Sequence, residues 1–377
     1  HAVSMAKSRT SDPNFRGFPE APKPKKVAGI YDGLVARLTS DQASRLAGLM
    51  LQSALEFDRR VEEVSGALTV VVERCAIVNS NGIASSDKAT KVIGHLTVEA
   101  KDPGTSEGSA WLGSTFLKDF YPDELGKKAA ELAVNSLNPR KVSHREYDLI
   151  LEPPAAAELL YHVLGYAVNG REVDERISYF SDRKGEEVAS ESFTLHDWGN
   201  MPNGICSRSF DDEGSPTQKT PLIERGRLMG FVYDHYYSGK AGTSSTGNGL
   251  RVGDLPGRRY DVYPSPELTN LVVEPGDFKR EELIADTKYG LLLSRIWYTY
   301  PITPQLGDFS TTSRCGFLVR GGEIIGAAKQ VRIHENLPEL LKRISGIADD
   351  VEQIMPWGAT AAVHSPTLRF SGVYISG

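Results

Sequence analysis

The histidines are the residues whose spacing would reveal a metal-dependent hydrolase. Such a site needs two or three histidine, cysteine or carboxylate ligands and a base near the bound water. Its usual signature is a pair of histidines on one helix with a glutamate between them. The chain has eight histidines, and no two of them lie within a few residues of each other. The sequence therefore contains no local zinc motif, and we expect this chain to bind no metal.

Two polar loops are further candidates for chemistry. The loop at residues 242–249 is rich in glycine and hydroxyl groups, so its backbone N–H groups could bind an anion. It lacks the spacing and the Lys-Ser/Thr ending of a phosphate-binding loop, which leaves a flexible loop or a substrate-contacting loop as interpretations. The run Asp211-Asp212-Glu213-Gly214 could supply an acidic pair, but these residue types also favour a solvated turn. No Gly-x-Ser-x-Gly motif of a serine hydrolase is present.

Composition and charge exclude several classes of protein. The length of 377 residues fits two or three domains. A net charge of -6 argues against nonspecific nucleic-acid binding. No apolar run approaches the ~20 residues that cross a bilayer. The three cysteines, Cys75, Cys206 and Cys315, are widely spaced and odd in number, which disfavours a disulfide framework. We therefore expect a cytoplasmic protein with no nucleic-acid or membrane partner.

The first part of the chain predicts a small α+β domain. Residues 1–30, rich in proline and basic residues, predict a mobile lead-in. Thr39 with Gln42 resembles a capping box that begins an amphipathic helix, whose apolar positions run to residue 61. Further elements are predicted as strands at 67–78 and 91–101, joined by an Asn81-Gly82 turn, and a helix at 123–137. We place a domain boundary near residue 143, so that this domain covers residues 31–143.

The remainder, residues 144–377, predicts a β-rich domain. A buried strand at 147–151 runs through Glu152 into a helix at 153–169, and proline is favoured at a helix start. Later come predicted strands at 192–195, 228–233, 270–274, 290–300 and 316–320, a Gly321-Gly322 hairpin, and a helix at 337–344. The fold class is therefore α+β, with a largely antiparallel sheet in the C-terminal domain.

Several segments, taken in their order and spacing, resemble the TldD/TldE family, whose second member is also called PmbA. They are residues 79–82, 85–87, 149–160, 212–217, 222–226, 245–248, 270–277, 321–324 and 366–370. The resemblance runs from about residue 75 to the C-terminus, and it implies a two-domain TldD/PmbA-like fold.

The resemblance also implies a metal motif that this chain has lost. In TldD the helix after the Glu-Pro strand carries His-Glu-x-x-x-His, and a cysteine near the C-terminus adds a ligand. In this chain Tyr161 and Tyr166 stand at the histidine positions, His162 stands at the glutamate position, and the cysteine position falls near Met355-Pro356-Trp357. A tyrosine is a poor zinc ligand because its phenol, with a pKa near ~10, must first lose a proton. His162 is the single candidate catalytic residue, and an ordinary hydrogen bond is its simpler interpretation.

This departure is the pattern of TldE, the subunit without a metal. The resemblance therefore implies a subunit that pairs with a TldD-like, zinc-containing metallopeptidase acting on unstructured peptides, and that is inactive alone. We expect seven residues to lie near the substrate: Asp212, Glu213, Gly214, Ser245, Thr246, Gly247 and Asn248. Two alternatives stay open. One is a self-sufficient metallopeptidase with a nonstandard site, and the other is a noncatalytic homodimer that binds a peptide or another small ligand.

Overall fold

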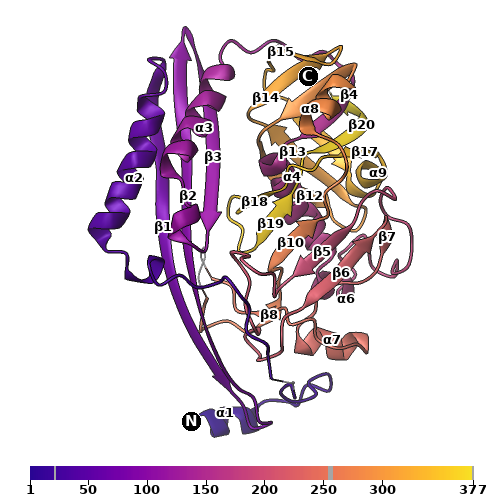
Figure 1. Cartoon of the computed structure of the whole chain (residues 1–377). Helices are drawn as coiled ribbons and strands as arrows, with labels where there is room; N and C mark the ends of the chain where they lie inside the picture. Colours follow the sequence, from indigo (N-terminus) through magenta and orange to yellow (C-terminus); the bar gives the residue numbers. More distant parts are fainter. Residues whose placement is uncertain (21–22, 254–257, 376–377) are drawn as a thin grey trace.

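Among the described residues, the two largest hydrophobic cores lie one in each half of the sequence. The computed structural model describes residues 1–20, 23–253 and 258–375. Figure 1 shows a long three-stranded sheet with two helices beside a larger body of packed sheets and helices. The mixture of helices and mainly antiparallel strands confirms the predicted α+β class.

The N-terminal half is built on strands β1 (Val61–Val78), β2 (Ala84–Asp102) and β3 (Gly104–Ser114), in the order β1-β2-β3. Helices α2 (Ser40–Leu55) and α3 (Pro122–Asn135) contribute Met50, Leu125 and Ala129 to its core. A Cβ at Gly108 would lie 2.2 Å from the backbone nitrogen of Ala133, so glycine allows α3 to pack directly on β3. The short elements here are α1 (Ala2–Ser8), η1 (Val35–Arg37) and η2 (Leu117–Asp119).

Several predictions for this half are confirmed, and others are wrong. The Thr39–Gln42 capping box and the turn at Gly82, with φ of +91°, are both present. Helix α2 ends at Leu55, whereas the apolar pattern predicted helix up to residue 61, and Val61 already belongs to β1. Strand β3 was missed because its glycine and serine residues are typical of loops. Pairing with β2 along its whole length makes it a strand.

The predicted lead-in contacts the tip of the β1–β2 hairpin, which extends beyond α2 and α3 in Figure 1. Asn81 donates a hydrogen bond from Nδ2 to the carbonyl oxygen of Phe18 at 2.7 Å. Asn79 does the same to the carbonyl oxygen of Pro19 at 3.0 Å. Residues 21–22 of the lead-in lie outside the described residues. The mobility of residues 1–30 stays a prediction.

The C-terminal half contains two six-stranded sheets, ordered β18-β19-β10-β5-β6-β7 and β15-β14-β11-β4-β20-β17. Among the described strands, parallel pairing occurs between β10 and β19 and between β11 and β4. The strands of the first sheet are β5 (Leu195–Trp198), β6 (Lys219–Glu224), β7 (Arg227–Leu228), β10 (Asn270–Val273), β18 (Glu352–Ile354) and β19 (Ala362–Ser365). Those of the second are β4 (Arg145–Leu151), β11 (Tyr289–Leu293), β14 (Gly316–Arg320), β15 (Glu323–Ala327), β17 (Ile344–Ile347) and β20 (Leu368–Ile375).

Smaller elements complete this half. A three-stranded sheet has the order β12-β13-β16, and β8 pairs with β9. These strands are β8 (Gly249–Leu250), β9 (Ser265–Pro266), β12 (Ile296–Thr303), β13 (Asp308–Ser313) and β16 (Arg332–Asn336). The helices are α4 (Pro153–Leu159), η3 (Leu160–Leu164), α5 (Gly165–Ala167), α6 (Gly170–Asp174), α7 (His235–Ala241), α8 (Arg280–Ala285) and α9 (Leu337–Lys342). In the described part of the chain, no helix has both the length and the apolar character needed to cross a bilayer.

Three strand predictions in this half are wrong in extent. The predicted strand at 290–300 is two strands, β11 and β12, which belong to different sheets. The chain turns between them at Ser294 and Arg295, where the Arg295 side chain pairs with Glu107 of β3 at 3.1 Å. The predicted strand at 228–233 ends at Leu228, and the one at 192–195 begins only at Leu195. Long-range contacts decide where these strands begin and end, and the local composition of the sequence does not reveal those contacts.

Candidate functional site

The helix that carries Tyr161, His162 and Tyr166 is not a regular α-helix. It passes from α4 through the π-helical turn η3 (Leu160–Leu164) into α5. A π-turn closes on the fifth following residue instead of the fourth, and such turns are frequent at functional sites. It therefore brings residues five apart, such as Tyr161 and Tyr166, closer to one face than an α-helix would. This is the spacing that the resemblance assigns to two metal ligands.

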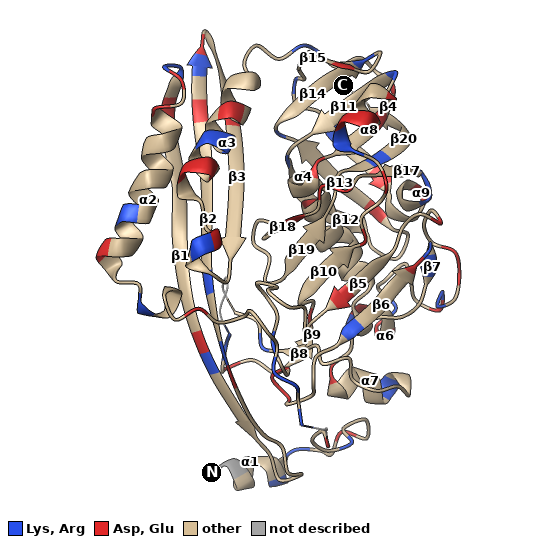
Figure 2. Ribbon diagram, in the orientation of Figure 1, with Lys and Arg blue, Asp and Glu red and all other residues tan. Residues whose placement is uncertain are grey.

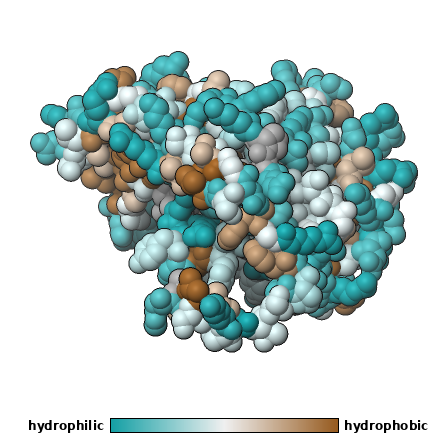
Figure 3. All heavy atoms as spheres, turned by 90° about the horizontal axis from the view of Figure 1, so that it is seen from below, coloured by the Kyte–Doolittle hydropathy of each residue, from teal (hydrophilic) through white to brown (hydrophobic). Residues whose placement is uncertain are grey.

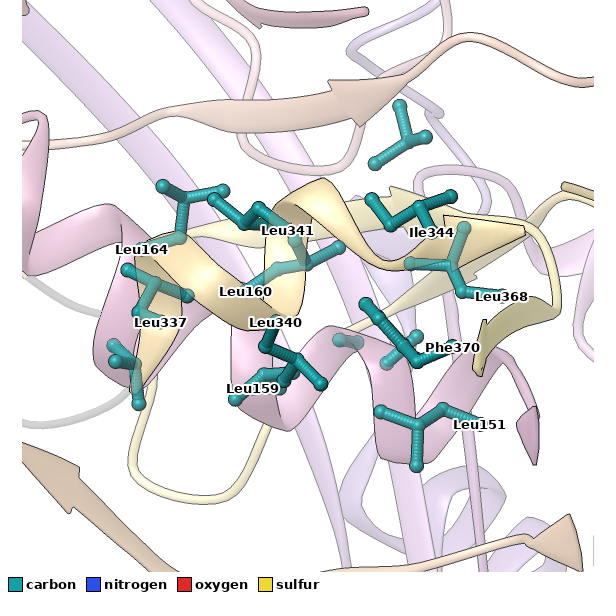
Figure 4. Close-up of a cluster of buried hydrophobic side chains, with 14 of the residues drawn as sticks. Leu151, Leu159, Leu160, Leu164, Leu337, Leu340, Leu341, Ile344, Leu368 and Phe370 are labelled. Carbon is teal, nitrogen blue, oxygen red and sulfur yellow. The ribbon is translucent and has the colours of Figure 1, made fainter. Parts of the chain in front are cut away.

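The opposite face of this helix is fixed in the core of the C-terminal half. Figure 4 shows Leu159, Leu160 and Leu164 beside the leucines of α9 and Phe370 of β20. The side of the helix at Gly165 is packed as closely, because a Cβ there would lie 2.6 Å from Cδ1 of Leu268. The helix can therefore hold its outward side chains in fixed positions.

Tyr161 is bonded to the segment of residues 355–360. Its hydroxyl accepts a hydrogen bond from the backbone N–H of Thr360 at 3.1 Å and lies 3.1 Å from the Thr360 hydroxyl. Burial raises the pKa of the tyrosine, so the phenol stays protonated near neutral pH. Tyr161 therefore acts as a hydrogen-bonding residue between the helix and this segment.

His162 and Glu158 hold the same segment from the neighbouring position on the helix. His162 Nε2 lies 3.2 Å from Glu158 Oε2 and 3.1 Å from the carbonyl oxygen of Trp357. Glu158 Oε1 accepts a hydrogen bond from the Trp357 N–H at 2.8 Å. The structure thus places residues 355–357, where the resemblance puts the cysteine of TldD, directly against this helix.

Tyr166 faces a group of charged residues that the sequence did not reveal. Burial, then a hydrogen bond and the negative charge of Glu172, raises the pKa of Tyr166 to about 12. Arg171 pairs with Glu172 at 2.8 Å. Burial raises the pKa of Glu267 to about 7, and the charge of this carboxyl also acts on Tyr161. No motif marks Glu267, Arg171 or Glu172, because folding brings together residues about 100 positions apart.

The donors on this face do not suit zinc. Tyr161 and Tyr166 are neutral phenols with raised pKa values, and the Nε2 atom of His162 is already engaged by Glu158 and Trp357. Within residues 1–20, 23–253 and 258–375, no group of three or more His, Cys, Asp or Glu side chains could hold a metal ion. Zinc requires deprotonated or neutral-imidazole ligands in a tetrahedral set, so the residues present do not fit the metal of a metallopeptidase.

The predicted acidic turn is buried, not solvated. Asp212 accepts hydrogen bonds from the side chain of Arg258 and from the backbone N–H of Arg251 at 2.7 Å. Only 8% of its side chain is exposed. Glu213 accepts from the backbone N–H of His235 at 2.7 Å. Burial and the charge of a neighbouring aspartate raise the pKa of Glu213 to about 8. Gly214, with φ of +92°, packs against the β1–β2 hairpin.

The second predicted loop is joined to the interior through Asn248. Its Nδ2 donates to Asp197 at 2.7 Å and to the carbonyl oxygen of Glu267 at 2.8 Å, while its Oδ1 accepts from Thr246 at 2.7 Å. Gly247, with φ of +76°, is buried. Ser245 Oγ lies 3.3 Å from the carbonyl oxygen of Tyr233.

The structure connects the two predicted loops with each other. The backbone N–H of Asp212 donates to the carbonyl oxygen of Gly249 at 2.8 Å, so the acidic turn meets the end of the second loop. Through Asn248 and Glu267 this assembly reaches Tyr161, on which the charge of the Glu267 carboxyl acts. Contact of the seven loop residues with a substrate stays a prediction.

Comparison with protein families matches both halves of the chain. Residues 34–137 match the PmbA/TldA metallopeptidase central domain, and residues 144–377 match the PmbA/TldA metallopeptidase C-terminal domain. The chain belongs to the PmbA/TldA metallopeptidase family. The resemblance drawn from its short motifs is therefore confirmed.

Family members with curated names are moderately similar. The metalloprotease TldD homolog of Buchnera aphidicola is 28% identical over 312 residues, which cover 79% of this chain and 63% of that protein. A metalloprotease of Methanocaldococcus jannaschii is 25% identical, and the match covers 78% of this chain and 64% of that protein. The TldD homolog of Haemophilus influenzae is 26% identical, and the match covers 90% of this chain and 73% of that protein. This chain thus spans less than two thirds of the length of the first two relatives.

Solved structures of the family agree in fold. TldE from Thermococcus kodakarensis superposes with a TM-score of 0.90 at 25% identity, covering all of this chain and 83% of that one. A putative modulator of a DNA gyrase from Thermotoga maritima has a TM-score of 0.87 at 23% identity, covering all of this chain and 82% of that one. The second likeness concerns the fold alone.

Proposed function

We propose that this chain is a TldE-like subunit without a metal, which works with a TldD-like metallopeptidase on unstructured peptides. The observation that supports this most is the helix of residues 153–167. The helix has a π-turn, which is frequent at functional sites, and it is closely packed. Tyr161, His162 and Tyr166 are engaged in hydrogen bonds, so these side chains do not form a set of ligands suited to zinc. The similarity to TldE of T. kodakarensis agrees with this role.

In this role the chain shapes and closes a cavity, and the zinc of the partner supplies the hydrolytic chemistry. Tyr161, His162 and Glu158 hold residues 355–360 in place. The loops around Asn248 and Asp212 are held by hydrogen bonds and lie near the helix that carries Tyr161. The three cysteines are free thiols, which suits the cytoplasmic location that we also propose.

The test is a peptidase assay with a fluorescence-quenched unstructured peptide, run on the isolated chain, the isolated TldD-like protein and the reconstituted pair. We expect the pair to cleave the peptide and this chain alone to be inactive. Equal rates for the TldD-like protein with and without this chain would contradict the subunit role.

Two measurements separate the remaining alternatives. Stoichiometric zinc in the isolated chain, together with cleavage that a chelator abolishes, would establish a self-sufficient metallopeptidase. Light scattering that shows a homodimer unchanged by the TldD-like protein would establish a noncatalytic homodimer. We expect light scattering to show a new species when both proteins are mixed, and elemental analysis to find zinc in the TldD-like protein.

A further inference from the structure

A cavity of about 610 Å³ lies between the two halves of the chain, at the beginning of α4. This volume is within the range of about 300–1,000 Å³ that is typical of small-molecule sites. One wall comes from α3 and β3, and the other from the start of α4 and from β11, β14 and β15. An ion pair crosses between the walls, because Lys128 of α3 lies 3.0 Å from Glu352 of β18.

The helix end that opens into this cavity is unsuited to anions. A helix N-terminus normally offers free N–H groups to an anion. Here the first two helical positions are Pro153 and Pro154, which have no N–H to offer. Glu152 precedes them and adds a negative charge. Its carboxylate is bound by Arg280 at 2.7 Å and by the hydroxyl of Ser294, so Arg280 is not available to a ligand.

Carboxylates outnumber cationic side chains around the cavity. Glu131, Glu152, Asp350 and Glu352 line it, against Lys128 and Arg280. Both cations are paired, with Glu352 and Glu152 respectively. Asp350 accepts hydrogen bonds from the backbone N–H and the hydroxyl of Thr367, which are neutral donors that leave its charge uncompensated. Among the described residues Glu131 has no ion-pair partner, and it is exposed on α3, where Figure 2 shows residues of both signs.

Most of the rest of the lining is apolar, and its polar members are Ser109, Asn135 and Ser294. Leu132 of α3 and Phe317 and Ile325 of the C-terminal sheet line the cavity with partly exposed side chains. Long basic side chains place their methylene stems on apolar surface and keep the charged group among polar partners. An apolar wall beside unpaired carboxylates is complementary to that shape.

We propose that this cavity binds a ligand with a guanidinium or ammonium group on an apolar stem, with the stem against Leu132 and Phe317 and the charge near Glu131 and Asp350. The site does not depend on the proposed peptidase role. Because its walls come from both halves of the chain, a bound ligand links them and raises the unfolding temperature.

The experiment is isothermal titration calorimetry of the full chain with two cationic probes. Agmatine carries a guanidinium and an ammonium at the two ends of a four-carbon stem, and acetyl-Gly-Arg-Gly-amide carries a guanidinium within a peptide. The neutral controls are butanol and acetyl-Gly-Gln-Gly-amide. We expect at least one cationic probe to bind about tenfold tighter than its neutral control, because the control cannot pair with the carboxylates of the cavity. Binding of agmatine alone identifies a free amine as the ligand, and binding of the peptide identifies a side chain.

Two matched variants place the binding in this cavity. Glu131→Lys should weaken the binding of the cationic probe about tenfold, because a positive charge that repels the probe replaces a negative charge that attracts it. Glu124→Lys makes the same charge change on the same helix, at an exposed residue outside the cavity, and should leave binding within about twofold. The proposal is overturned if neither cationic probe binds, if the neutral controls bind equally well, or if both variants weaken binding alike.

Discussion

Glu158 and His162 lie four residues apart on one helix, and their side chains meet at 3.2 Å between Oε2 and Nε2. Each also contacts the backbone of Trp357, the carboxylate at the N–H and the imidazole at the carbonyl oxygen. Trp357 in turn stacks on Trp297, with ring centroids 6.0 Å apart, and meets the ring of His95 edge-on at 5.8 Å. The two residues therefore connect the helix to a strand of each half of the chain.

Replacing Glu158 by glutamine should lower the stability of the protein. The buried carboxylate accepts a hydrogen bond from Trp357 and pairs with His162, and the neutral amide weakens both interactions. We expect the free energy of unfolding to fall by about 1–3 kcal/mol, as for a lost hydrogen bond to a charged group. Urea denaturation followed by tryptophan fluorescence measures it. The exposed residue Glu124 is the control, and Glu124→Gln should change stability by less than about 0.5 kcal/mol.

Replacing Gly165 by alanine tests how closely the helix is packed. The new Cβ would lie 2.6 Å from Cδ1 of Leu268, so the side chain or the helix must shift. We expect a loss of about 1–3 kcal/mol, which is typical of an overpacked core. Gly48→Ala, in the middle of α2 with no atom within 4 Å of the new Cβ, is the matched control. It should be neutral or stabilising by up to about 1 kcal/mol. Equal effects at both sites would contradict the close packing.

Rebuilding the metal motif tests the role of the π-turn. The turn at residues 160–164 brings positions 161 and 166 towards a common face. We therefore expect the triple variant Tyr161→His, His162→Glu, Tyr166→His to bind zinc at least about tenfold tighter than the original chain, since neutral imidazole replaces protonated phenol. Competition with a chromogenic chelator measures the affinity. The single variant Tyr161→His is the control and should gain little. If the triple variant gains no more than the control, the two positions do not share a face.

Local signals in the sequence predict much of the fold but little of the site. The Pro153 helix start, the Asn81-Gly82 turn and the α+β class follow from residue preferences that act over a few positions. The π-turn is followed by Gly165, which packs against Leu268 about 100 residues away, and no local signal in the sequence shows that contact. The acidic turn of Asp212 has the composition of a solvated turn, yet tertiary contacts bury it.

The surface adds one feature that local sequence patterns do not reveal. The face seen in Figure 3 is largely hydrophilic, but apolar residues gather towards the left of the view.

The buried carboxyl of Glu213 should make stability depend on pH. Its pKa is raised from 4.5 to about 8 by burial and by the charge of Asp211. Between these values the folded chain holds a proton that the unfolded chain has released, so folding is favoured at low pH and loses stability as pH rises towards 8. The Gln side chain is neutral and can still accept from the His235 N–H. Glu213→Gln should therefore lose less stability than the original chain between about pH 5 and pH 8.5. Urea denaturation at several pH values measures this slope. Glu224→Gln, at an exposed residue of β6, should keep the original slope, and an unchanged slope in Glu213→Gln would show that the carboxyl is already ionised in the folded state.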